Sequence, residues 1–175
     1  PLALAQANEV RNKLLILDQI DPEKVKIEII KTSGDMFLNT SLSKIGGKGL
    51  FTKEIQQALI DKRIDIAVHS MKDVETDLPE KLVISTILKR EDVRDSFISR
   101  RYFSIADLPL GSVVGTSSLR RKAQLLNKRK DLKVVEFRGN VQKRLEKLDN
   151  NVAVATFLAT AGLNRLGLNE LINPI

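Results

Sequence analysis

Hydrophobic and polar residues alternate along the chain with two periods. A spacing near 3.6 residues predicts helices over residues 1–17, 51–62, 117–128, 141–148 and 159–166. Short apolar runs predict buried strands over residues 25–30, 64–68, 83–88, 96–99, 112–115, 132–137 and 152–158. Residues 32–49 are polar and rich in Gly and Ser, which predicts a loop too long to be an ordinary connection.

The order of these elements predicts an α/β fold. Strands and helices alternate through the second half, a pattern typical of parallel strands joined by crossover helices. Charged residues concentrate around residues 89–100, where we expect a junction between two domains. We predict two lobes, residues 1–88 and 100–175, joined by a hinge over 89–99. The lobes should hold mixed, mostly parallel sheets, with a ligand cleft between them.

Composition limits the possible functions. The 175 residues include no cysteine and a single histidine. A disulfide framework and a cysteine nucleophile are therefore excluded, and we predict no metal site. No apolar run approaches the roughly 20 residues of a membrane span, and no secretion signal opens the sequence. We expect a cytoplasmic protein without a membrane partner.

Positive charge is concentrated in the second half of the chain. Lys and Arg number 12 against 13 Asp and Glu in residues 1–88, and 17 against 9 in residues 89–175. A sequence pI near 9.7 is compatible with nucleic-acid binding. However, aromatic residues make up only 4%, and no stacking motif accompanies the basic residues. We favour a pocket for a small polyanion over a nucleic-acid partner.

The first basic cluster, GTSSLRR over residues 115–121, turns from a predicted strand into a predicted helix. Thr116 or Ser117 is placed to cap that helix. Arg120 and Arg121 then oppose the helix dipole at a cost of about 0.3–1 kcal/mol each. A bound carboxylate or phosphate would remove that cost. The alternative is a solvated basic helix.

A second basic cluster, residues 137–144, repeats this pattern after the next strand. Asn140 is the expected helix cap, and Arg138 should point at the carboxyl end of its strand, beside the arginines of the first cluster. The glycine-rich stretch 43–51 adds two lysines, but its spacing is not that of a P-loop. The alternative there is a flexible lysine loop.

The sequence HSMKD, residues 69–73, follows another predicted strand. A carboxylate beside a lysine stays ionised at neutral pH, so Asp73 can stabilise a cation or carry a proton. His69 lacks the partners that orient a catalytic base, and we interpret it as structural. Together these clusters indicate a substrate with several carboxylates or phosphates, whose chemistry generates positive charge.

Seven segments, in this order, resemble the porphobilinogen deaminases, also called hydroxymethylbilane synthases. They are PLALAQA (1–7), LSKIGGKGLFTKE (42–54), DIAVHSMKDV (65–74), REDVRDSFIS (90–99), VGTSSLRRKAQL (114–125), FRGNVQKRLEKLD (137–149) and AGLNRLG (161–167). They span nearly the whole chain, and HSMKD, GTSSLRR and RGNV are jointly very specific. The chain is similar to the N-terminal two-domain part of that family.

The resemblance implies a transferase of tetrapyrrole (haem and porphyrin) biosynthesis. Its members join four porphobilinogen molecules into hydroxymethylbilane with loss of ammonia, on a dipyrromethane cofactor held by a cysteine. Porphobilinogen carries an acetate and a propionate, which fits the arginines and lysines. Loss of ammonia leaves an azafulvene-like cation, which fits a lone carboxylate. The implied fold has three domains, the first two similar to periplasmic binding proteins, and members are typically monomeric.

The resemblance also implies roles for individual residues. Asp73 would be the catalytic group, in contact with pyrrole nitrogens. The residues implied to bind substrate or cofactor are Lys44, Lys48, Phe51, Ser70, Lys72, Thr116, Ser117, Ser118, Arg120, Arg121, Arg138, Gly139, Arg144 and Arg165.

The sequence also departs from the family pattern. The family's first strand and its third domain, which carries the cofactor cysteine, have no counterpart here, and VAVATF (152–157) replaces a tyrosine–aspartate strand start. We expect both domains to be incomplete. We also expect the chain alone to be inactive, and marginally stable or self-associating. The alternative is a non-catalytic module that binds a polyanion or a pyrrole.

Overall fold

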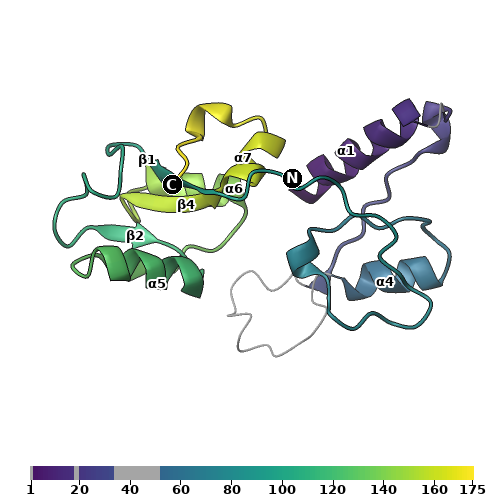
Figure 1. Cartoon of the computed structure of the whole chain (residues 1–175), viewed down its shortest axis with the longest axis horizontal. Helices are drawn as coiled ribbons and strands as arrows, with labels where there is room; N and C mark the ends of the chain where they lie inside the picture. The colour runs from purple at the N-terminus through teal and green to yellow at the C-terminus, as the bar shows by residue number, and fades with distance from the viewer. Residues whose placement is uncertain (1, 18–19, 34–51) are drawn as a thin grey trace. The chain divides into compact units, whose positions relative to one another are not determined.

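The computed structural model describes residues 2–17, 20–33 and 52–175. The chain divides into two compact units, Pro1–Leu88 and Lys89–Ile175, called unit 1 and unit 2 below (Figure 1). Helices and strands both occur, so the fold is α/β, as predicted.

Two predicted helices form in unit 1. They are α1 (Leu2–Leu17) and α4 (Lys53–Ile60), and short 3-10 turns follow at η1 (Pro22–Lys24) and η2 (Met71–Asp73). α1 has no fully buried residue, and in α4 the buried side chain is Ala58.

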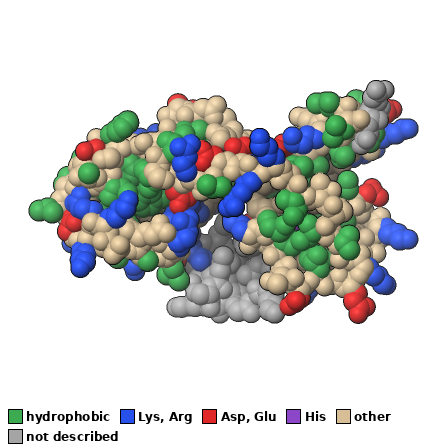
Figure 2. Space-filling model, in the orientation of Figure 1, with side chains coloured by type: hydrophobic (Ala, Val, Ile, Leu, Met, Phe, Trp, Pro, Cys, Tyr) green, Lys and Arg blue, Asp and Glu red, His purple; other side chains and the backbone are tan. Residues whose placement is uncertain are grey.

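The strand predictions in unit 1 are wrong, because residues 25–30, 64–68 and 83–88 form no strand. A strand requires hydrogen bonds to a neighbouring strand, and these segments pair with no other described residues as strands. Val83 and Ile87 are 81% and 72% exposed. Figure 2 accordingly shows hydrophobic side chains on the surface of this unit. The apolar runs therefore identify segments suited to pairing without determining that they pair.

Unit 2 contains a mixed four-stranded sheet with the order β1-β4-β2-β3. β2 is parallel to both β3 and β4, whereas β1 is antiparallel to β4. The strands are β1 (Asp95–Ser99), β2 (Val113–Gly115), β3 (Lys133–Val135) and β4 (Ala155–Ala159).

Helices connect the parallel strands of unit 2 (Figure 1). α5 joins β2 to β3, and α6 joins β3 to β4. The last strand leads into α7 and the 3-10 turn η3. The bounds are α5 (Leu119–Lys128), α6 (Val141–Asp149), α7 (Thr160–Arg165) and η3 (Asn169–Leu171).

The core of unit 2 lies on both faces of the sheet. Phe97 of β1 is directly opposite Phe157 of β4, with ring centroids 6.0 Å apart. Leu125 of α5 packs in the same cluster. The other cluster contains Leu148 of α6 and Leu163 of α7. Since side chains alternate between the faces of a strand, α5 covers one face while α6 and α7 cover the other.

This topology marks one edge of the sheet for ligand binding. β2 and β4 are adjacent and parallel, yet the helices that follow them lie on opposite faces. In open α/β sheets, ligands bind beyond the carboxyl ends of two such strands. Here these ends are Gly115 and Ala159.

Among the described residues, no helix is long and apolar enough to cross a membrane.

Candidate functional site

The turn that follows β2 starts at a closely packed glycine. A Cβ atom on Gly115 would lie only 2.3 Å from Cγ of the buried Phe137, so glycine lets the ring approach the strand. Thr156 Oγ1 donates a 2.6 Å hydrogen bond to the Gly115 carbonyl. The N–H of Thr116 donates to the Val135 carbonyl at 2.9 Å. These contacts hold the start of the turn in place on the sheet.

Ser118 caps α5. Its Oγ accepts the Arg121 N–H at 3.4 Å, and its backbone is still extended, so the helix begins at Leu119. The prediction that Thr116 or Ser117 is the cap is wrong. Thr116 is buried, and its Oγ1 instead accepts the N–H of Ser118 at 3.2 Å. Ser117 is exposed.

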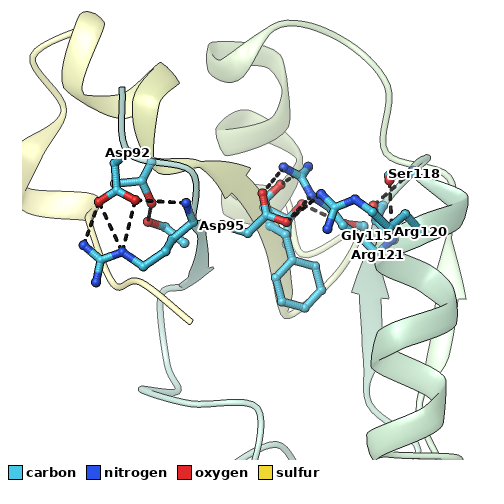
Figure 3. Close-up of polar contacts among 12 residues, drawn as sticks. Asp92, Asp95, Gly115, Ser118, Arg120 and Arg121 are labelled. Atoms are coloured by element: carbon cyan, nitrogen blue, oxygen red, sulfur yellow. Dashed lines mark hydrogen bonds and ion pairs between the residues drawn. The ribbon is translucent and has the colours of Figure 1, made fainter. Parts of the chain in front are cut away.

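Two arginines of the first turn of α5 converge on Asp95 (Figure 3). Arg121 donates to the Asp95 carboxylate through Nη2 at 2.5 Å and Nε at 3.0 Å, and through Nη1 to the Phe157 carbonyl at 3.0 Å. Arg120 donates to Asp95 through Nη2 at 3.1 Å. The Arg121 side chain is 14% exposed and that of Arg120 is 61% exposed.

Asp95 changes the electrostatics expected for this helix start. Burial raises the pKa of Asp95, but hydrogen bonds and charge from Arg121 and Arg120 outweigh burial, and the net shift is downward. We expected a bound anion to offset the unfavourable interaction of the two arginines with the helix dipole. Asp95 provides part of that negative charge. Sequence reasoning missed Asp95. The available signal was an acidic residue directly before the predicted strand 96–99, which contains Phe97 and Ile98.

The second cluster is organised by side chains of α6. Asn140 is the helix cap, as predicted, and its Oδ1 accepts the N–H three residues later at 2.9 Å. Gly139 has φ +115°, a conformation that favours glycine. Arg144 Nε donates to the Gly139 carbonyl at 2.9 Å, and Lys147 Nζ donates to the Arg138 carbonyl at 3.1 Å. Two cations thus hold successive carbonyls of the turn.

Arg138 and Arg144 differ in their partners. Arg138 Nε pairs with Glu136 at 3.1 Å. Arg144 is half-buried and forms no ion pair with any residue that the structure describes. Burial lowers the pKa of Arg144, and the neighbouring positive charge of Arg121 lowers it further. An anion placed here would oppose both effects, so this location suits a carboxylate.

The predicted residues of unit 1 form a separate group on and before η2. Lys72 Nζ contacts Asp73 Oδ1 at 2.8 Å, with the two side chains 80% and 40% exposed. Ser70 Oγ and the Gln6 side-chain amide exchange hydrogen bonds of 3.1 and 3.2 Å. Burial lowers the pKa of His69, and Asp73 opposes that shift. An anion and an adjacent cation therefore stand at the exposed end of this segment.

The remaining predicted residues add less to the geometry. Arg165 lies in the last turn of α7, away from the residue that opens that helix. Lys44, Lys48 and Phe51 lie outside the described residues. Within the described ranges, no group of His, Cys, Asp and Glu could hold a metal ion.

Unit 2 is thus an open α/β domain whose strand ends and helix starts gather arginines, as in anion-binding α/β proteins. The chain belongs to the porphobilinogen deaminase family. A family model described as "Porphobilinogen deaminase, dipyromethane cofactor binding domain" matches residues 1–175. The resemblance seen in the sequence is confirmed.

Curated relatives agree with this assignment. Porphobilinogen deaminase of Paracoccus denitrificans (strain Pd 1222) is 59% identical over 95% of this chain and 53% of its own length. The chloroplastic porphobilinogen deaminase of Pisum sativum is 57% identical over 97% of this chain and 47% of its own length. That of Oryza sativa subsp. japonica is 59% identical over 100% and 49%. The chain spans about half the length of the curated relatives it matches.

Proposed function

We propose that this chain is the cofactor-binding part of a porphobilinogen deaminase. In that role the whole protein is a transferase of tetrapyrrole biosynthesis, which joins four porphobilinogen molecules into hydroxymethylbilane and releases ammonia. The family match over residues 1–175 and the names of the relatives support this proposal.

The observation that carries the proposal is the position of Arg144. Its guanidinium is half-buried, lies close enough to Arg121 for like-charge repulsion, and uses Nε alone in a hydrogen bond to a described residue. A guanidinium binds a carboxylate through two parallel N–H groups. A pyrrole carrying an acetate or a propionate therefore matches this donor set.

The same residues fit the carboxylates of a dipyrromethane cofactor. When bound, that group supplies the pyrrole position to which substrate is joined. Arg144 would bind a carboxylate of the group, while Arg120 presents an exposed guanidinium at the same sheet edge. The chain contains no cysteine, so the contacts that it contributes are non-covalent.

Asp73 is the proposed catalytic group. Its carboxylate can stabilise the positive charge that develops when ammonia leaves the substrate, and Lys72 lies against it at 2.8 Å. The other contacts given above for the family residues stay predictions. So do the hinge over 89–99, the two periplasmic-binding-protein-like lobes and the cytoplasmic location.

The proposal is tested by titrating porphobilinogen into the chain in a calorimeter. We expect saturable binding, weakened about 10-fold or more in Arg144→Ala, because a hydrogen bond to a charged group contributes about 1.5–3 kcal/mol. Lys143→Ala is the matched control, since it removes the same charge from the preceding, exposed position. Absence of binding, or equal small losses in both variants, would contradict the proposal.

A further inference from the structure

Strand pairing brings an acidic side chain to the proposed binding edge. Asp95 is the first residue of β1, and the antiparallel register places it opposite Ala159, the last residue of β4. The carboxyl end of β4 therefore lies beside the start of β1. The Asp95 side chain is 16% exposed and meets the arginines of α5 there (Figure 3).

The contacts of Arg121 determine the orientation of its guanidinium. Nε and Nη2 donate to the Asp95 carboxylate, while Nη1 donates to the Phe157 carbonyl. The guanidinium is planar and its donors form a rigid fork. Two acceptors on different strands, β1 and β4, therefore fix the plane of the guanidinium.

Arg120 is held differently, by a single contact. Its Nη2 donates to the same carboxylate at 3.1 Å. No other hydrogen bond joins its side chain to the part of the chain that the structure describes. Its remaining donors are on a side chain that is 61% exposed. One carboxylate thus tethers Arg120 while leaving most of its donors available to a ligand.

We propose that Asp95 is a positioning residue, which orients Arg121 and Arg120 at the sheet edge for recognition of the carboxylates of a pyrrole ligand. This inference rests on the proposed function. Pre-organised donors bind a carboxylate without first losing the freedom of long side chains. Asp95 acts through the two arginines and does not itself contact the ligand.

The proposal opposes the expectation from net charge. Asp95 is an anion among cations, so neutralising it makes the edge more positive, and Coulomb attraction alone would tighten binding of a dicarboxylate. Positioning predicts the reverse, because arginines without their common acceptor spread over several rotamers. The sign of the change in affinity therefore separates the two explanations.

The experiment compares Asp95→Asn with Asp92→Asn by calorimetric titration of porphobilinogen into the full chain. Asp92 is a matched control. Its side chain is 21% exposed and binds one arginine, Arg94, through Nη2 at 2.6 Å. The charge change is the same in the two variants. We expect about 10-fold weaker binding for Asp95→Asn and less than twofold change for Asp92→Asn.

Two further measurements separate the geometry of the carboxylate from its charge, and test the orientation of Arg121 without a ligand. Asp95→Glu keeps the charge but displaces the carboxylate by one methylene, and we expect it also to weaken binding. In NMR spectra of the free chain, the Arg121 Nε–H should exchange slowly with water. Slow exchange should be lost in Asp95→Asn and kept in Asp92→Asn.

The outcomes test the positioning role of Asp95 and the proposed function separately. Unchanged or tighter binding in both Asp95 variants overturns the positioning role and leaves the proposed function intact. Fast exchange of the Arg121 Nε–H in the unsubstituted chain also overturns it. If the unsubstituted chain fails to bind porphobilinogen, the proposed function is overturned, and with it the role of Asp95 in recognition.

Discussion

Gly115→Ala tests the packing beneath the turn after β2. The new methyl carbon would lie 2.3, 2.4 and 2.6 Å from three ring atoms of Phe137. Ordinary contact requires about 3.4 Å or more, so the ring or the strand has to move by about 1 Å. Phe137 is fully buried, with the Lys147 ammonium 5.5 Å from its ring centroid. Overpacking of this kind costs about 1–3 kcal/mol.

Urea unfolding measures the loss. With a slope of about 1–3 kcal/mol/M, a loss of about 2 kcal/mol lowers the midpoint by about 1 M. Combining Gly115→Ala with Phe137→Ala removes the Cγ and Cδ atoms of the ring that clash. The double variant should therefore retain about 0.5–3 kcal/mol more stability than the sum of the single losses predicts.

Gly111→Ala is the control. It has φ +73° and no heavy atom within 4 Å of the added carbon, so its cost is conformational. Its loss should add to that of Phe137→Ala within about 0.5 kcal/mol. Unchanged stability of Gly115→Ala, or simple additivity with Phe137→Ala, would refute the packing argument.

Three other predictions concern unit 2. Ser118→Ala should lower the unfolding free energy by about 0.5–2 kcal/mol because it removes a helix cap, while Ser117→Ala, at an exposed neighbouring position, should not; urea unfolding of both variants checks this. Lys147→Met should lower the unfolding free energy by about 1–2 kcal/mol in the same assay, since it removes a cation–π contact and a hydrogen bond to a carbonyl. An equal loss of unfolding free energy in Lys143→Met would contradict this prediction. The pKa of Asp95 lies below its ordinary value of 3.8, so its contribution to stability is present above that pH and is lost as pH falls through the folded-state pKa. Acid titrations should therefore show a smaller loss of stability for Asp95→Asn, and parallel curves would contradict the shift.

The elements of unit 2 could be predicted because local signals agree there. Each predicted strand and helix of that unit forms, and none of its ends moves by more than three residues. Asn140 was identifiable as a cap because it stands alone before an apolar-periodic segment. Thr116, Ser117 and Ser118 offer three consecutive hydroxyl groups. The position at which the backbone becomes helical decides among them, and no local pattern shows that position.

Long-range pairing could not be predicted. An apolar run is the same whether a strand is parallel, antiparallel or unpaired, so the pattern did not show that β1 is antiparallel or that residues 83–88 form no strand. The contact between Asp95 and Arg121 joins residues 26 positions apart. It exists because the register of β1 on β4 brings the start of one strand to the end of the other. The sequence identifies Asp95 only as an acidic residue at the start of a strand, and it does not show which residue the register brings to it.

The arginines at the sheet edge differ in how fully the protein uses their donors. Arg121 is committed to two acceptors, Arg120 to one, and Arg144 to a backbone carbonyl without any carboxylate among the described residues. The environment of Arg144 is unfavourable to its positive charge, because its pKa is lowered by burial and then by the charge of Arg121. A ligand carboxylate therefore gains most at Arg144, because there it replaces a missing counter-ion. At Arg121 it can use only the N–H groups that the Asp95 carboxylate and the Phe157 carbonyl do not occupy. Asp95 and a ligand therefore have different roles. Asp95 orients the arginines, and the ligand carboxylate supplies the counter-ion of Arg144.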